Sequence, residues 1–342
     1  MQKSRDEPTI SKPIGKNRHP PPASLLTAYD LKIVFELIAV LPFAWLAPVG
    51  SFGFIAEVFA RLGSVTGMAD AQGLGAKINR MANGYLDEES ALAAGFELEA
   101  WRYQDYMQIL RANGPGDWRP DIRVEGFDIV EGALAHGQGA ILWISHFTFG
   151  TLLTAMALQR AGLQPRHATL SSHGFSWSRF GRVFLNPIRC RIEERYLERI
   201  IVDSNAAVSG SRTLMKTLAS NGLVTITAGA WVGRQIHELS FLNGKIRFAT
   251  GATSLARSTG AALIPVHGLW DGDAKTFRVI AEPPLPVPRE GDRRRLAEDV
   301  MSAYLDRLRP WALRFPGQWR GWARMTACED PGGGKICGGR AR

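Results

Sequence analysis

Short, uninterrupted apolar segments alternate with segments of helical periodicity through the middle of the chain. Residues 139–145 (GAILWIS), 223–227 (LVTIT) and 261–266 (AALIPV) are apolar runs of the kind that form strands buried on both faces of a sheet. Residues 151–160 (TLLTAMALQR) and 252–258 (ATSLARS) are typical of helices. The alternation predicts an α/β fold with a mainly parallel central sheet flanked by helices.

A different pattern lies nearer the N-terminus, where residues 37–56 (LIAVLPFAWLAPVGSFGFIA) carry no charged side chain. This stretch is as long as the roughly 20 residues that a membrane-spanning helix needs. Pro42 and Pro48 interrupt it, and a proline inside a helix removes a hydrogen bond and kinks the axis. We therefore expect broken helices that lie in or dip into one leaflet of a membrane, rather than one straight spanning helix. An ordinary buried helical hairpin is the alternative that the pattern leaves open.

These patterns divide the 342-residue chain into four parts. The first residues are basic, and no apolar stretch begins until after a run of three prolines, which is not the order found in a secretion signal. We expect a disordered basic arm over 1–24, a membrane-associating helical segment over 25–60, an α/β domain over 61–325 and a flexible tail over 326–342. Within the domain, the spacing predicts a pair of surface helices over 85–112 and a last helix near 293–308.

Composition narrows the classes of protein that fit this organisation. Apolar residues make up 45% of the chain and charged residues 21%, which excludes wholesale disorder and a polytopic membrane protein. The 41 basic residues exceed the 32 acidic ones, giving a formal charge of +9 that favours an acidic partner: nucleic acid, an anionic membrane surface or a phosphorylated substrate. No aromatic-rich recognition strand accompanies the charge, which argues against nucleic acid.

The cysteines and the common catalytic motifs exclude further classes. Cys190, Cys328 and Cys337 lack the spacing of a metal site and cannot all pair, so neither a zinc module nor a disulfide framework is expected. The sequence contains no G-x-S-x-G elbow, no phosphate-binding G-x-x-x-x-G-K-[ST] loop and no H-E-x-x-H, the signals of lipases, nucleotide hydrolases and zinc peptidases.

The segment SHFTFGT, residues 145–151, is the best candidate for chemistry. His146 follows a predicted buried strand and precedes a predicted helix, so it lies at the carboxyl edge of the sheet, where open α/β folds bind their ligands. An imidazole there can take a proton from a substrate hydroxyl or amine at neutral pH. A core histidine bound to backbone is the structural alternative.

This segment resembles the first motif of the glycerolipid acyltransferase superfamily, in particular its lipid A lauroyl/myristoyl acyltransferase branch, in which a His is followed after four residues by Asp or Glu. The blocks FLNGKIRFATGA (241–252) and LARSTGAALIPV (255–266) resemble the later family region in which a substrate-lining turn precedes a helix and a strand. The tail FPGQWRGW (315–322) is similar to the family's Pro-Glu-Gln-Trp-type ending. The resemblance covers residues 28–325.

The resemblance implies an acyltransferase that moves a fatty acyl group from a thioester of acyl carrier protein or coenzyme A to a hydroxyl or amine of a lipid-like acceptor, without metal or redox cofactor. It implies a peripheral or monotopic protein on the cytoplasmic face of the inner membrane. His146 is then the general base, and Thr151 stands where the family has its orienting carboxylate. The remaining proposed substrate contacts are Arg179, Lys245, Arg247, Phe248 and Gly251.

Thr151 departs from the family pattern because it keeps a hydroxyl but lacks the negative charge. In a serine protease, neutralising the equivalent carboxylate lowers turnover by about ten-thousandfold. A second departure is Gly229-Ala230-Trp231, where the family commonly has an Asp-Gln pair. Three explanations remain open: an acceptor that needs less activation, a carboxylate that reaches the histidine from elsewhere (Asp203, Glu193 or Glu238), or a catalytically silent homologue that binds lipid or partners an active enzyme.

Overall fold

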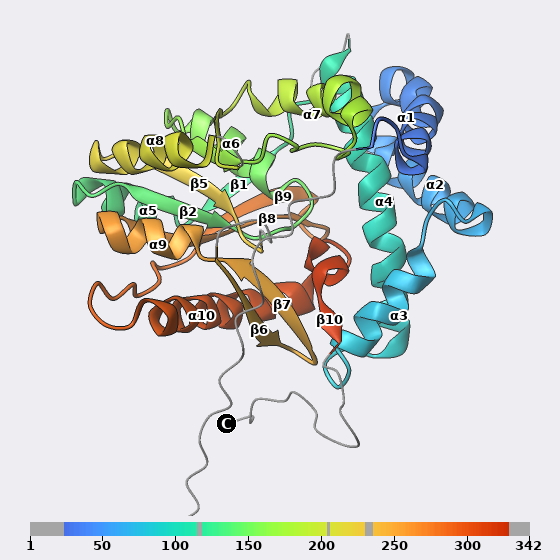
Figure 1. The fold of residues 1–342 in the computed structure, drawn as a ribbon. Coiled ribbons are helices and arrows are strands. Elements are labelled where there is room, and N and C mark those ends of the chain that lie inside the picture. The colour runs from blue at the N-terminus through green and yellow to red at the C-terminus, as the bar shows by residue number, and fades with distance from the viewer. Residues whose placement is uncertain (1–23, 115–117, 204–205, 230–234, 328–342) are drawn as a thin grey trace, which may run out of the picture.

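A seven-stranded sheet forms the centre of the computed structural model, which describes residues 24–114, 118–203, 206–229 and 235–327 (Figure 1). The strands lie in the order β1-β9-β8-β2-β5-β3-β4, and every neighbouring pair is parallel except β8 and β9. Their bounds are β1 Ile122–Glu125, β2 Ala140–Ile144, β3 Arg166–Thr169, β4 Glu198–Ile201, β5 Leu223–Thr227, β8 Ala262–Asp271 and β9 Thr276–Ala281. The α/β fold with a mainly parallel sheet is therefore confirmed.

Helices cover both faces of this sheet. The side chains of β2 alternate between two apolar clusters: Ile141 and Trp143 pack on one face, and Leu142 and Ile144 on the other. The first face is covered by α8 (Ala207–Ala219), α9 (Gly251–Thr259) and α10 (Arg293–Arg314), and the second by α5 (Phe127–Ala135) and α6 (Gly150–Arg160). Strand β2 is thus buried on both sides, as its uninterrupted apolar sequence predicts.

A small second sheet lies beside the main one. It consists of the hairpin β6 (Ile236–Phe241) and β7 (Gly244–Ala249), extended by β10 (Thr326–Ala327). Thr326 and Ala327 pair with Lys245 and Gly244, so the prediction of a flexible tail starting at residue 326 is wrong at its first two residues. The rest of that tail, and the predicted basic arm except Ser24, lie outside the described residues.

The predicted helix pair over 85–112 is instead the single helix α4 (Glu88–Asn113). Gly95 in its middle lets α3 (Ala71–Met81) approach closely, since a Cβ at Gly95 would lie 2.3 Å from the Ala71 carbonyl oxygen. The glycine therefore serves helix packing and does not end the helix. Of the 26 residues of α4, 14 are buried, because α1, α2 and α3 all pack against it (Figure 1).

The N-terminal apolar stretch forms α1 (Ala28–Leu46), the short 3₁₀ turn Val49–Ser51 and α2 (Phe52–Thr66). The break lies near Pro48, whereas Pro42 is accommodated inside α1, contrary to the expectation that it interrupts the helix. No single described helix is long and apolar enough to cross a membrane; only the bent pair Val49–Thr66 and Ala71–Met81, with 95° between its halves, meets that criterion.

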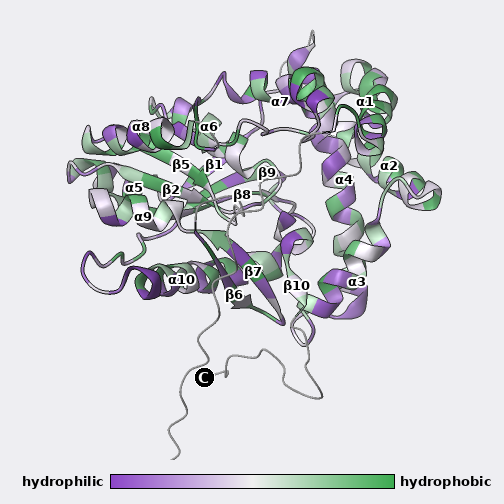
Figure 2. Cartoon of the chain, viewed as in Figure 1, coloured by the Kyte–Doolittle hydropathy of each residue, from purple (hydrophilic) through white to green (hydrophobic). Residues whose placement is uncertain are grey.

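Polar contacts attach α1 to the rest of the molecule. The side chain of Asp30 caps α1 and accepts a hydrogen bond from Ser178 Oγ at 2.9 Å. Glu36, which is buried, pairs with Arg102 of α4 at 2.5 Å. These contacts lie on the inner side of α1, and its outer side is apolar and exposed (Figure 2).

Candidate active site

The loop that carries His146 leaves β2 at the carboxyl edge of the sheet and is held by the C-terminal segment. The His146 carbonyl oxygen accepts a hydrogen bond from the Arg320 N–H at 2.9 Å, and the Thr148 N–H donates to the Gln318 carbonyl at 2.9 Å. The Gln318 amide in turn bonds both backbone groups of Trp270 on β8, at 2.7 and 2.9 Å. The family-like tail of the sequence therefore fixes the backbone of the histidine loop.

The turn into α6 is tight. Phe149 has φ of 61°, in the left-handed region that bulky residues rarely adopt. The next residue, Gly150, lies against Gly268 of β8, where a Cβ would come within 2.9 Å of the Gly150 Cα atom. Strained backbone of this kind persists only where the surrounding structure over-determines it, and it concentrates at functional sites.

The ring of His146 is largely buried and has no acidic partner among the residues that the structure describes. Its Nδ1 atom is buried and makes no hydrogen bond to any described residue. Burial, and then the positive charges of Arg324 and Arg320, hold the pKa of His146 well below the usual value of an imidazole. The ring is therefore neutral at neutral pH, which is the form that can accept a proton.

Thr151 lines the same cavity as His146, but its hydroxyl is directed elsewhere. Its Oγ1 atom is hydrogen bonded to Thr227 Oγ1 at 3.2 Å, and no described contact joins it to the histidine. Within the described ranges, none of the three carboxylates considered as substitutes bonds to His146 either. Asp203 accepts from Ser171, Glu238 pairs with Lys245 and Arg247, and Glu193 pairs with a different histidine, His173.

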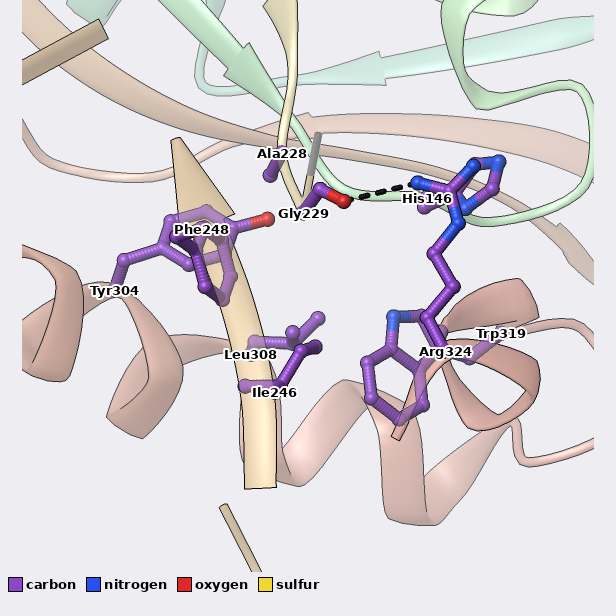
Figure 3. Close-up of a pocket in the computed structure, with 10 residues that line it drawn as sticks. His146, Ala228, Gly229, Ile246, Phe248, Tyr304, Leu308, Trp319 and Arg324 are labelled. Carbon is purple, nitrogen blue, oxygen red and sulfur yellow. Dashed lines mark hydrogen bonds between the residues drawn. The ribbon is translucent and has the colours of Figure 1, made fainter. Parts of the chain in front are cut away.

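A cavity of about 1330 Å³ opens in front of His146. Two further predicted contacts, Phe248 and Gly251, line it, and the lining includes many apolar side chains. These include Trp143, Phe147, Phe149, Leu152, Leu214, Ile226 and Leu255. Its volume exceeds that of ordinary small-molecule pockets, and an apolar wall of this extent suits a hydrocarbon chain. A second cavity of about 10 Å³, room for about one water molecule, is also lined by His146 (Figure 3).

The charged wall of the large cavity differs from the one predicted. Arg179 is exposed and outside the cavity lining, and Lys245 and Arg247 pair with Glu238 on the hairpin, also outside the lining. The structure therefore does not bring these three predicted anion contacts to His146.

Arg320 and Arg324 lie beside His146 in their place. The Arg324 guanidinium donates to the Gly229 carbonyl oxygen at 2.9 Å (Figure 3) and forms no ion pair with a described carboxylate. Arg320 lies 3.4 Å from Asp105, a carboxylate that it shares with Arg189. Arg320 is the first residue of the tail motif RGW, and Arg324 follows two residues after it. This motif is the sequence feature that could have indicated both arginines.

His173, another histidine in the cavity wall, was not predicted from the sequence. His173 Nε2 lies 2.8 and 3.0 Å from the two carboxylate oxygens of Glu193 in α7 (Asn186–Glu193). Despite burial, which acts in the opposite direction, His173 and Arg189 lower the pKa of Glu193 to about 2. Cys190, by contrast, donates to the His173 carbonyl, and burial raises the pKa of its thiol, so it is not an activated nucleophile. The described part of the chain holds no group of three metal-ligating side chains.

Comparison with known families is consistent with this geometry. The profile of the bacterial lipid A biosynthesis acyltransferases matches residues 102–319, a span that holds His146, Thr151, His173 and the hairpin. The chain belongs to this family.

Membership makes the protein a lipid acyltransferase and confirms the resemblance expected from the motifs. No curated protein matches the chain significantly. Among solved structures, the 1-acyl-sn-glycerophosphate (LPA) acyltransferase PlsC from Thermotoga maritima is similar, with 12% identity and a TM-score of 0.33 over 75% of this chain and 94% of that one.

Proposed function

We propose that this lipid acyltransferase moves a fatty acyl group from an acyl carrier protein or coenzyme A thioester to a hydroxyl or amine of a lipid-like acceptor, with His146 as the proton acceptor. The observation that carries the proposal is the position of His146: a neutral imidazole at the carboxyl edge of β2, in the wall of a large cavity with an extensive apolar lining.

The reaction needs little beyond positioning and proton transfer, because a thioester is already activated. As the acceptor oxygen or nitrogen attacks the thioester carbonyl carbon, its proton passes to His146, the new bond to carbon forms, and the carbon–sulfur bond breaks. The thiolate leaves with the electron pair of that bond. The apolar wall holds the acyl chain and aligns the carbonyl carbon, which contributes through orientation.

The arginines beside His146 provide a site for the anionic part of a substrate. Arg324 has no described carboxylate partner, so a phosphate group can bind it without first displacing an ion pair. A phosphopantetheine arm and a phosphorylated lipid acceptor both carry such a group. These arginines take the role that the sequence assigned to Arg179, Lys245 and Arg247.

The exposed face of α1 and α2 supports attachment to a membrane, which we propose to be the cytoplasmic face of the inner membrane. Large apolar side chains on both helices are exposed to solvent: Leu31, Phe35, Ile38, Trp45 and Leu46 on α1, and Phe54, Leu62 and Val65 on α2. Tyr29, in the first turn of α1, also lines the cavity, so this face and the cavity share an edge. An apolar surface of this extent marks an interaction site.

A catalytically silent lipid-binding homologue, or the partner subunit of an active enzyme, is the second candidate. His146 Nδ1, which makes no hydrogen bond to a described residue, and the uncharged Thr151 favour it, because no described carboxylate takes the orienting role that the family motif gives to Asp or Glu. The cavity and its apolar wall would serve lipid binding equally well.

An acyl-transfer assay separates the two candidates. Purified protein in detergent is incubated with labelled acyl carrier protein or acyl coenzyme A and lipid extracts, and the His146→Ala variant is compared with wild type. Loss of product in this variant, with normal product from His136→Ala on the exposed end of α5, supports the mechanism. Equal product from wild type and His146→Ala refutes the role of His146, and absence of product from both favours the silent homologue.

Flotation with vesicles that contain anionic lipid tests the membrane proposal. We expect wild type to float, and a variant with serine at Leu31, Phe35 and Ile38 to stay largely in the soluble fraction. Ile236→Ser, which removes an exposed apolar side chain from the hairpin, is the control and should float like wild type. A wild-type protein that stays soluble in the presence of vesicles would contradict membrane attachment.

A further inference from the structure

Three histidines line the large cavity, and two of them, His146 and His173, have surroundings that differ in charge. His146 is flanked by Arg320 and Arg324 and has no described acidic partner, whereas His173 is bonded to the carboxylate of Glu193. When two titratable groups in one site have environments of opposite character, they suit opposite roles in acid–base catalysis.

The His173–Glu193 pair has a defined geometry. Glu193 is 4% exposed and accepts from His173 Nε2 with both oxygens, so the Nε2–H is fixed and the other nitrogen, Nδ1, is left to exchange a proton. Nδ1 makes no hydrogen bond to the part of the chain that is described, and the side chain is 32% exposed and lines the cavity. Arg189 lies 4.0 Å from Glu193 and pairs with Asp105, so it helps to fix the position of the Glu193 carboxylate.

We propose that His173 is the general acid of the acyl transfer and protonates the sulfur of the departing thiol, with Glu193 as its positioning residue. This assignment rests on the proposed function. The acceptor proton goes to His146 as the new bond to the acyl carbon forms. The carbon–sulfur bond breaks, its electron pair stays on sulfur, and the proton on His173 Nδ1 passes to that sulfur. His146 then carries one proton more and His173 one proton fewer, and exchange with water restores both.

The acid role of His173 and the base role of His146 follow from the charges that surround each ring. A proton on His173 Nδ1 makes the ring a cation, which the Glu193 carboxylate stabilises. The same proton on His146 would add a third positive charge beside two arginines, so this ring is kept neutral and ready to accept. In the proposed cycle, His173 is the proton donor and His146 the proton acceptor.

A change of leaving group, combined with substitutions of the histidines and Glu193, tests the assignment. A selenol is far more acidic than a thiol, so a selenolate departs without being protonated. The experiment compares wild type, His173→Gln, Glu193→Gln and His146→Gln with a saturated acyl thioester of coenzyme A or carrier protein, and with the same donor carrying selenium in place of sulfur. We expect His173→Gln to lower kcat by about 10²-fold with the thioester and to approach wild type with the selenoester. Glu193→Gln should show the same selective defect in weaker form.

Three controls decide the outcome. His146→Gln should be slow with both donors, because the acceptor proton must be removed in either case. His237→Gln removes a second histidine–glutamate pair, with Glu298 at 2.8 Å outside the cavity lining, and should be normal with both. Thermal melting monitors folding, and Glu193→Gln, which keeps the size of the side chain, serves if His173→Gln is unstable.

A His173→Gln defect of equal size with both donors, or no defect with either, would overturn the assignment while leaving the proposed function in place. Wild type that transfers acyl groups from neither donor would overturn the proposed function itself, and this assignment with it.

Discussion

His167 offers a quantitative test of how burial sets the charge of this site. It lies on β3 in the cavity wall, is 3% exposed, and its Nδ1 atom is hydrogen bonded to Thr225 Oγ1 at 2.9 Å. Burial, as the largest influence, lowers the pKa of His167 from 6.5 to about 4. The folded protein therefore resists taking up a proton that the unfolded chain accepts below pH 6.5.

The sign and size of the effect follow from linkage. At pH 7 both states are largely neutral at this position, so His167 has almost no influence on stability. At pH 5 the unfolded chain is protonated and the folded protein is not, and each factor of ten in proton affinity is worth about 1.4 kcal/mol. We expect His167 to lower the free energy of unfolding by about 2 kcal/mol between pH 7 and pH 5.

Urea denaturation followed by tryptophan fluorescence measures this difference. Wild type and His167→Gln are unfolded at pH 7 and at pH 5, and glutamine can retain the hydrogen bond to Thr225. The remaining acid-sensitive groups act equally in both proteins, so the variant should lose about 2 kcal/mol less than wild type on acidification. An equal loss in the two proteins would refute the assignment of a neutral, buried imidazole at this position.

Three further predictions concern the His146 loop. Thr151→Asp places a negative charge near the histidine and should raise kcat by roughly tenfold or more over wild type, whereas Thr151→Asn should not. Equal kcat values for wild type and Thr151→Asp would show that a carboxylate at this position does not influence His146. Gln318→Ala leaves both backbone groups of Trp270 without their partner and should lower the free energy of unfolding by about 2 kcal/mol in urea denaturation; an unchanged midpoint would contradict it. Arg324→Gln should raise the KM for a phosphate-bearing donor, measured in the acyl-transfer assay, and rescue by Arg324→Lys would confirm that charge is what matters.

Elements set by local pattern were predicted well from the sequence. The strand over 223–227 was predicted with the bounds that the structure has. Five consecutive apolar or β-branched residues are typical of a strand that is buried on both faces of a sheet. His146 was found for the same reason, since its place is fixed by the strand that precedes it. The prediction of two helices over 85–112 was wrong, because one continuous helix forms there and Gly95 inside it packs against α3, a contact that the local sequence does not contain.

The charged part of the site could not be predicted in this way, because it depends on contacts between distant segments. His173 meets Glu193 only through the fold of the connection between β3 and β4. Arg320 and Arg324 reach His146 from the end of the described chain, whereas Arg247 looked nearer in the motif and pairs with Glu238 instead. Residue type and spacing therefore predicted arginines near His146, but not which ones.

The dependence of the histidine loop on Gln318 and Arg320 has a consequence for biosynthesis. Thr148 and Gln318 are 170 residues apart, and the backbone bonds between these segments complete the loop. A ribosome releases α1 and α2 long before it reaches this closing segment, so a growing chain presents these apolar helices early and acquires an ordered reaction centre only after Gln318 and Arg320 have been made. If those helices do meet lipid, the polypeptide arrives at the bilayer before it is able to turn over substrate.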